Sequence, residues 1–175
     1  MSQVEPESQS AIAPAEELSV PAWVYPYRVG LIGGLCGGLA MVVVALVYGE
    51  LHGSVWLPVN LIGATLVRSL QTASLEQLSQ FNAAGFAAGL SLHVGLSIGL
   101  GLVFALLLPT LPGPVLVWSV VIGSGLWILA SLLTLPLLNP VMDVYVDRGS
   151  FFVAHVAYGF VLGLWIRRSP KIHVR

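Results

Sequence analysis

The stretch that decides the fold is VGLIGGLCGGLAMVVVALVY, which occupies residues 29–48. It carries no charge over a length of about twenty residues, which as an α-helix crosses a hydrocarbon core roughly 30 Å thick. Residues 83–108, 115–135 and 150–166 have the same character, although the last stretch is short for a span. The sequence therefore predicts an all-α integral membrane protein, a four-helix bundle that occupies residues 28–168.

The composition supports this fold class. Of the 175 residues, 57% are hydrophobic and 9% are charged, whereas soluble domains are about 25% charged. The net charge is −1 and the basic residues form no stripe, so the sequence supports neither a nucleic-acid partner nor a polybasic lipid-binding patch. We expect the lipid bilayer to be the partner of most of the surface. Cys36 is the single cysteine, so an internal disulfide is excluded.

The two ends of the chain read as tails. Residues 1–27 hold four glutamates and neither lysine nor arginine, so we expect no signal peptide and predict disorder up to about Val20. Trp23, Tyr25 and Tyr27 then predict an aromatic anchor at the membrane interface. Residues 169–175 form a short basic tail.

Lysine and arginine counts near the span ends predict the orientation. Five such residues lie on the side of the termini, against two on the other side: Arg28, Arg167, Arg168, Lys171 and Arg175 against Arg68 and Arg148. Because basic residues favour the cytoplasmic side, both termini are expected in the cytoplasm and the protein in the inner membrane of a bacterium.

The first outer segment, from Glu50 to Asn82, is too long and too apolar for a plain loop. Apolar residues recur there at helical spacing, which predicts one or two helices in the membrane interface. Ser74 and Gln77 have the spacing of a capping box, so a helix is expected to start near Ser74 and run toward the second span.

Two features recur once in each half and indicate a duplicated two-helix hairpin. After the first span comes Pro58-Val59-Asn60, and after the third comes Asn139-Pro140-Val141. The second span has His93 followed by small residues at spacings of four, and His155 in the fourth span is followed in the same way. Residues at this spacing lie on one ridge of a helix.

Small residues on such ridges let transmembrane helices approach closely. We predict ten helix-packing glycines: Gly30, Gly33, Gly34, Gly37, Gly38, Gly85, Gly89, Gly101, Gly159 and Gly163. Those of the first span fall on two adjacent ridges, so this helix is expected at the centre of the bundle. The glycine string opens no βαβ unit, which argues against a phosphate-binding loop.

Ionisable side chains inside a membrane mark functional sites by default, and His93 and His155 lie well inside predicted spans. One interpretation makes them the axial ligands of haem b between glycine-lined helices. A second makes each a neutral imidazole that is hydrogen-bonded to a hydroxyl or carbonyl of a facing helix. A third is proton or ligand handling. We expect the second, and therefore no cofactor.

Five polar residues are placed near the outer surface, namely Asn60, Asn139, Asp143, Asp147 and Arg148. They could bind a metal or a substrate, but two acids beside an arginine are more often solvated or paired with it, so no metal site is expected. The span cores hold no Asp, Glu, Lys or Arg, which disfavours an ion-coupled carrier. Serine elbows, HExxH and paired carboxylates are absent from the sequence, so no catalytic residue and no enzyme activity is predicted.

The glycine-rich first span, the motif WLPVNL at residues 56–61 and Asn139-Pro140-Val141 carry a resemblance. From Gly30 to Trp165 the chain resembles a family of small uncharacterised bacterial four-helix membrane proteins. The resemblance implies a gene neighbourhood of cytochromes and haem-copper oxidases and no assigned activity, and no site residue is carried over from it.

Many packing surfaces with few chemical groups favour a non-catalytic accessory or assembly subunit of a larger membrane complex, with a respiratory complex favoured by the resemblance. Its partners would be other membrane-protein subunits or a second copy of the chain. Two alternatives stay open: a small carrier or channel that acts as an oligomer, and a b-type haem protein that uses His93 and His155.

Overall fold

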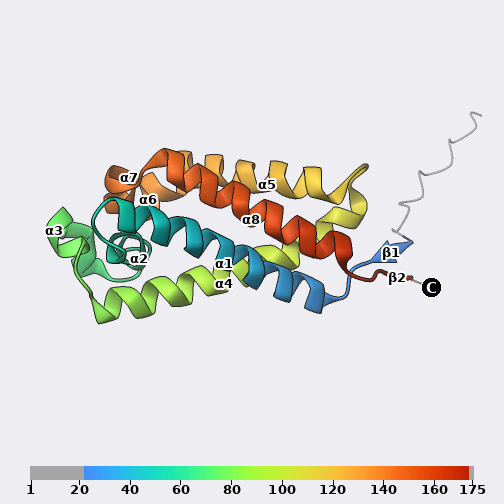
Figure 1. The fold of residues 1–175 in the computed structure, drawn as a ribbon, viewed down its shortest axis with the longest axis horizontal. Coiled ribbons are helices and arrows are strands. Elements are labelled where there is room, and N and C mark those ends of the chain that lie inside the picture. The colour runs from blue at the N-terminus through green and yellow to red at the C-terminus, as the bar shows by residue number, and fades with distance from the viewer. Residues whose placement is uncertain (1–21, 174–175) are drawn as a thin grey trace, which may run out of the picture.

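Four long helices run side by side in the computed structural model, which describes residues 22–173 (Figure 1). Three are α1 (Tyr27–Leu51), α4 (Ala83–Leu107) and α8 (Arg148–Arg168). The remaining long helix, which is the third span in chain order, is continuous through α5 (Val115–Leu129), η3 (Ala130–Thr134) and α6 (Leu135–Leu138). Each is long and apolar enough to cross a bilayer. The predicted fold class is confirmed, and the protein is a multi-pass membrane protein.

Shorter elements gather at the two ends of these helices (Figure 1). At one end lie α2 (Trp56–Gly63), η1 (Arg68–Thr72), α3 (Leu75–Leu78) and α7 (Pro140–Tyr145), and we call residues 52–82 and 139–147 the cap. The opposite, terminal end carries η2 (Leu108–Thr110) and two short strands, β1 (Trp23–Val24) and β2 (Ile172–His173).

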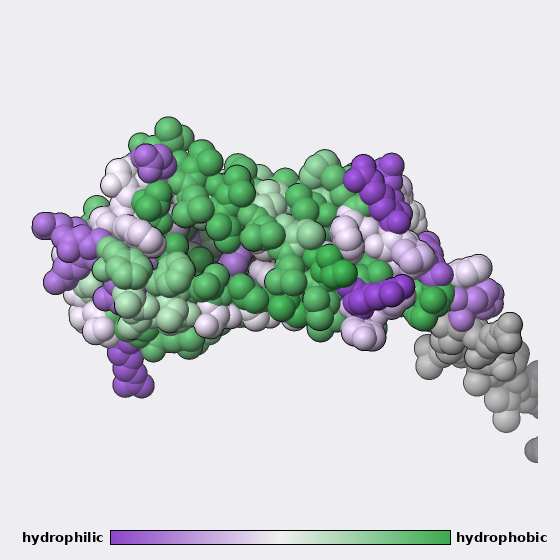
Figure 2. Space-filling view, turned by 60° about the horizontal axis from the view of Figure 1, so that its bottom comes forward, coloured by the Kyte–Doolittle hydropathy of each residue, from purple (hydrophilic) through white to green (hydrophobic). Residues whose placement is uncertain are grey.

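The spans pack in the order α4, α1, α8, α5. Helix α1 contacts both α4 and α8, so its predicted central position is confirmed, whereas α4 and α5 do not pack closely along their lengths. Figure 2 shows an apolar band between two hydrophilic ends, and a small hydrophilic area lies in a hollow within that band. This is the surface expected of a protein whose middle faces lipid.

Helix boundaries extend beyond most predicted spans. The fourth span begins at Arg148 rather than Ser150, because the Asp147 carboxylate accepts a hydrogen bond from the Ser150 backbone N–H and caps the helix. The third span continues a little beyond Leu135 and ends at Leu138, just before Asn139-Pro140. Proline is tolerated in the first turn of α6, and the preceding five residues form a π-helical segment, so the helix reaches Leu138.

The first outer segment contains helices, as predicted, but they are short. The capping box is present, since Ser74 Oγ accepts from the Gln77 N–H and the Gln77 side chain accepts from the Ser74 N–H. The helix it starts ends at Leu78, however, and α4 starts afresh with Asn82 as its own cap. Helix α2 packs on α4, so it is part of the bundle and not only a surface helix.

The two terminal tails pair with each other. Strand β1 pairs antiparallel with β2, and Lys171 lies over the ring of Tyr25, 5.5 Å from its centroid. Of the predicted aromatic anchor, Tyr25 is buried against the bundle while Trp23 and Tyr27 are exposed. The predicted disorder up to Val20 falls outside the described residues.

Candidate functional site

The two span histidines come from α4 and α8, which run in the same direction (Figure 1). One hydrogen bond joins these helices directly: the Tyr158 hydroxyl donates to the Ser97 carbonyl oxygen at 2.8 Å. His93 precedes Ser97 by one helical turn, and His155 precedes Tyr158 by nearly one turn. Both histidines therefore lie on the cap side of the same α4–α8 contact, at similar depth.

Each histidine donates one ring N–H to a backbone carbonyl. His93 Nε2 is 3.0 Å from the Gly38 oxygen of α1, and His155 Nδ1 is 2.8 Å from the Phe151 oxygen of its own helix. Because a carbonyl only accepts, the bonded nitrogen carries the proton and the other nitrogen of a neutral ring is an acceptor. The acceptors are thus His93 Nδ1 and His155 Nε2.

These two acceptor nitrogens form no hydrogen bond within residues 22–173. They are also absent from the fully enclosed, unsatisfied polar atoms of that range, which are Trp127 Nε1 and Ser131 Oγ. Both histidines are half-buried. The structure therefore presents two reachable lone pairs about midway along the bundle.

A haem between the two imidazoles is hard to fit to this arrangement. Axial ligands from two parallel helices hold the macrocycle lengthwise between them, so that it extends over the neighbouring turns. One of those turns is occupied by the Tyr158–Ser97 hydrogen bond, and the Tyr158 ring packs edge-to-face on Phe104. The expected hydrogen bond to a facing helix is present for His93, whereas His155 instead donates to a carbonyl of its own helix.

The predicted packing glycines lie where helices touch, beginning with α1 and α4. A Cβ atom added at Gly30 would lie 2.6 Å from the Gly101 carbonyl oxygen, and one at Gly34 would lie 3.2 Å from the Gly101 Cα. At Gly38 it would lie 2.8 Å from the Ser97 Cβ. These distances are too short for a side chain, so glycine is required for this crossing.

The second glycine ridge of α1 faces α8, as its offset predicts. A Cβ atom at Gly37 would lie 2.9 Å from the ring of Tyr158, and one at Gly33 would lie 3.0 Å from the ring of Trp165. The two ridges of α1 therefore have separate partners, which explains the central position of this helix.

Helices α5 and α8 cross in the same manner as α1 and α4. A Cβ atom at Gly123 would lie 3.2 Å from the Gly159 Cα, and one at Gly163 would lie 3.0 Å from the Ser119 Cβ. Ser119 is fully buried here, as Ser97 is in the other crossing. Each predicted hairpin thus has a crossing of glycines against a buried serine.

The last predicted glycines, Gly85 and Gly89 of α4, receive α2. A Cβ atom at Gly89 would lie 2.5 Å from the Val59 carbonyl oxygen, and one at Gly85 would lie 2.5 Å from Asn60 Oδ1. A further glycine, Gly63 of α2, was missed by the sequence analysis although it approaches the Gly85 Cα in the same way. The residues four positions before and after it are Val59 and Val67, which are not small, so the sequence shows no small-residue ridge at Gly63.

Other glycines of the spans have no internal partner. Gly95 and Gly99 of α4 and Gly125 of α5 are exposed, and an added Cβ atom at any of them would meet nothing within 4 Å. Ser91, Gly95 and Gly99 follow one another at spacings of four and are all exposed. They form a small-residue ridge on α4, which we call the outer ridge.

Two of the five polar residues placed at the outer surface are instead buried. Asn60 and Asn139 are 1% and 2% exposed. The Asn60 amide donates to the carbonyls of Leu78 and Gln80, and the Asn139 amide donates to the Leu61 carbonyl and to Thr65 Oγ1. Short helices and turns leave many backbone carbonyls without helical partners, and these amides satisfy them.

The other three polar residues stay near the surface. The Arg148 guanidinium forms an ion pair with the Asp143 carboxylate and also donates to the Ser131 carbonyl at 3.4 Å. Asp147 caps α8, and the backbone hydrogen bond from Ser150 lowers the pKa of its carboxyl below the usual value. The three residues are placed for helix capping and pairing rather than for a shared ligand.

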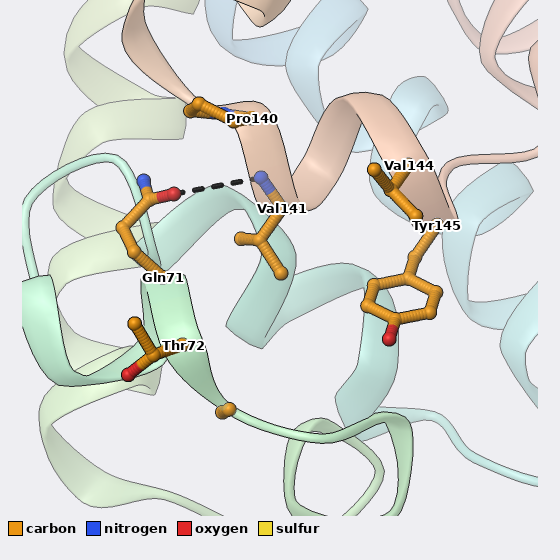
Figure 3. A pocket seen from close by; sticks show the side chains of 7 residues that line it. Gln71, Thr72, Pro140, Val141, Val144 and Tyr145 are labelled. Atoms are coloured by element: carbon orange, nitrogen blue, oxygen red, sulfur yellow. Dashed lines mark hydrogen bonds between the residues drawn. The ribbon is translucent and has the colours of Figure 1, made fainter.

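A groove of about 300 Å³ lies on the cap between η1 and α7 (Figure 3). Gln71 lines it, with its amide turned toward Val141, whose N–H is 3.5 Å from Gln71 Oε1. The same amide donates to the Ala64 carbonyl at 2.7 Å. The Gln71 amide of this groove is therefore already engaged in holding the cap together.

Within the described residues, no group of three or more His, Cys, Asp or Glu side chains could hold a metal ion. No protein-family model matches the chain, and neither a curated protein nor a solved structure shows significant similarity to it.

Proposed function

We propose that the protein is a non-catalytic accessory or assembly subunit that packs against a larger membrane complex, with a respiratory complex as the first to be tested. The outer ridge of α4 is the observation that carries the proposal. Glycine destabilises a helix by about 1 kcal/mol relative to alanine, and the glycines of the interior are required by close contacts. Gly95 and Gly99 have no such contact inside the monomer. A neighbouring transmembrane helix would provide it.

The orientation that fits this proposal has the terminal end in the cytoplasm and the cap outside. Arg28, Arg167, Arg168 and Lys171 all belong to the terminal end, as the charge rule requires. Membrane-impermeant thiol labelling tests it with Thr110→Cys at the terminal end and Glu76→Cys on the cap, both in a Cys36→Ala background. Labelling of the first from outside would reverse the orientation.

Purification in mild detergent tests the subunit proposal. We expect membrane proteins to co-purify in fixed stoichiometry and to be lost when Gly95 and Gly99 are both replaced by leucine. Gly125→Leu is the matched control, because it also adds a side chain in open space but is flanked at spacings of four by Val121 and Leu129. A monodisperse monomer without partners would contradict the proposal.

A carrier or channel formed by several copies is the second candidate, and the two similar crossings of α1 with α4 and of α5 with α8 favour it. Inverted or parallel repeats of this kind are common in transporters. Solute flux into proteoliposomes that depends on His93 would support it. If the outer-ridge variant no longer forms oligomers and no flux is measured for the unmutated protein, self-association is the only role left for that face.

A further inference from the structure

We propose that an anionic phospholipid binds where α5 and α8 meet at the terminal end, with an acyl chain in a groove between these helices and its headgroup beside Arg167. The inference does not depend on the subunit proposal, because it concerns α5 and α8 and not the outer ridge of α4. It differs from the contact that lipid makes with any apolar surface, since it assigns a fixed position and a preferred headgroup charge.

The groove has a volume of about 350 Å³ and lies between α5 and α8, which pack side by side (Figure 1). Hydrocarbon side chains line it, namely Leu116, Val117, Val120, Val121 and Phe160. Val117, Val121 and Phe160 are exposed, so the groove opens toward lipid. An acyl chain fits this lining, because a polar group there would lose its hydrogen bonds to water without gaining others.

The groove reaches the terminal end of both helices. Leu116 and Val117 belong to the first turn of α5, and a Cβ atom added at Gly163 of α8 would lie 3.1 Å from Leu116 Cδ1. Arg167 follows Gly163 by four residues and Phe160 by seven, so it shares their side of α8. It lies roughly 10 Å beyond Phe160 along the helix axis. Arg167 is therefore placed where the headgroup lies when the acyl chain of the same lipid occupies the groove.

The charges at this end favour an anion. Arg167 is exposed and forms no ion pair within residues 22–173. The acidic residues of that range all lie at the cap end, namely Glu50, Glu76, Asp143 and Asp147. The start of α5 adds partial positive charge, since Pro114 provides no side-chain cap for its first N–H groups. A headgroup with a net negative charge complements this end, whereas the choline cation of a zwitterionic lipid does not.

The test uses the full-length protein in a non-ionic detergent, and native mass spectrometry counts the bound lipids. The protein is titrated with palmitoyl-oleoyl phosphatidylglycerol and with the matched phosphatidylcholine, which has the same acyl chains but no net headgroup charge. We expect the first phosphatidylglycerol to bind about fivefold more tightly than the first phosphatidylcholine, which is the effect of one basic residue on an anionic headgroup.

Variants then locate the two parts of the site. Arg167→Gln should remove the preference for phosphatidylglycerol. Arg168→Gln is the matched control and should keep it, because Arg168 has the same charge at the same end of α8 but lies about 100° around the helix from Arg167. Val121→Trp fills the groove and should weaken both lipids by a similar factor. Val43→Trp, on an exposed face of α1, is its control and should change neither.

Equal affinities of the two lipids for the unmutated protein overturn the proposal, and this comparison needs no variant. Equal losses with Arg167→Gln and Arg168→Gln also overturn it, since the attraction would then belong to the terminal end as a whole. Unchanged binding in Val121→Trp would show that no acyl chain lies in the groove. If the unmutated protein is a dimer that Val121→Trp dissociates, a second copy of the chain fills the groove and the proposal is wrong.

Discussion

The spans and the cap are held together by different chemistry. Where α1 crosses α4, the contact is glycine backbone against glycine backbone, and a Cβ atom at Gly30 would lie 2.6 Å from the Gly101 oxygen. In the cap, the contacts are buried side-chain amides that donate to backbone carbonyls, as Asn139 does to Leu61 at 2.7 Å. Both kinds occur together where α2 of the cap packs on α4: Gly63 approaches the Gly85 backbone, and the Asn60 amide donates to the Leu78 carbonyl.

The difference follows from which backbone groups each region leaves without a partner. A long helix satisfies its own backbone, and lipid is as apolar as leucine, so spans gain from close van der Waals contact rather than from hydrophobic burial. The cap is made of helices of four to eight residues and turns, whose carbonyls need donors from elsewhere. Glycine permits the close contact between spans, and asparagine supplies the donors for the carbonyls of the cap.

The sharpest way to break this comparison is Gly34→Leu. The new side chain would collide with the Gly101 backbone, since its Cβ alone would lie 3.2 Å from the Gly101 Cα. We expect the free energy of unfolding to fall by about 3 kcal/mol, at the upper end for overpacking. Unfolding in mixed micelles with increasing dodecyl sulfate, followed by circular dichroism, measures it.

Gly99→Leu is the control for this substitution, because it makes the same change on a helix face in open space. It should leave the monomer as stable or raise its stability by a few tenths of a kcal/mol through better helix propensity. If the two variants lose equal stability, glycine matters in these spans through the backbone and not through close packing.

The second prediction concerns the cap. Asn139→Ala removes bonds to the Leu61 carbonyl and to Thr65 Oγ1 and also the cap on the Met142 N–H, so about 2 kcal/mol should be lost. Amide hydrogen exchange should rise in α2 and α7 before it rises in the spans. Asn82→Ala is the control, because Asn82 only caps Gly85, and about 1 kcal/mol is expected. Uniform exchange across the chain would show that the cap is not a separate unit.

The fold was predictable because charge-free length and glycine spacing are local signals. Stretches of about twenty apolar residues mark spans directly, and the two ridges of α1 followed from the spacing of Gly30, Gly34 and Gly38 and that of Gly33 and Gly37. The cap was predicted less well, because the helix expected after Ser74 stops at Leu78. Nothing local distinguishes a four-residue helix from a longer one when the packing around it sets its end.

The site was predicted in its residues but not in its contacts. His93 and His155 stood out as ionisable groups in apolar stretches, whereas Tyr158 and Ser97, which join the same helices, carry no such signal. The surface position expected for Asn60 and Asn139 is wrong, because that expectation assumed that a polar residue near a span end faces water. Their carbonyl partners lie 18 and 78 residues away in the chain and could not be inferred from either position.

A smaller effect is expected for the polar contact that does occur inside the bundle. Tyr158→Phe removes the hydroxyl that donates to the Ser97 carbonyl but keeps the ring against Gly37. Hydrogen bonds between membrane helices contribute about 0.6 kcal/mol on average, and we expect a loss of that order. Tyr145→Phe, on the half-exposed cap groove, should cost nothing measurable. A loss above about 2 kcal/mol would mean that polar contacts, and not glycine contacts, hold the spans.

The smallest effect is expected at Asp147, where the cap joins the last span. The backbone N–H of Ser150 donates to its carboxylate at 2.6 Å and lowers its pKa in the folded protein. A carboxyl with a lowered folded-state pKa stabilises the fold at pH values above its unfolded pKa, which is about 3.9. That contribution is lost as the pH falls through the folded-state pKa. Because solvent screens this exposed group, a few tenths of a kcal/mol are expected.

The unfolding free energies of the native protein and of Asp147→Asn, which keeps a capping oxygen but no charge, should differ at pH 7 and converge below about pH 4. A difference that stays constant over this range would assign the stabilisation to cap geometry and not to charge.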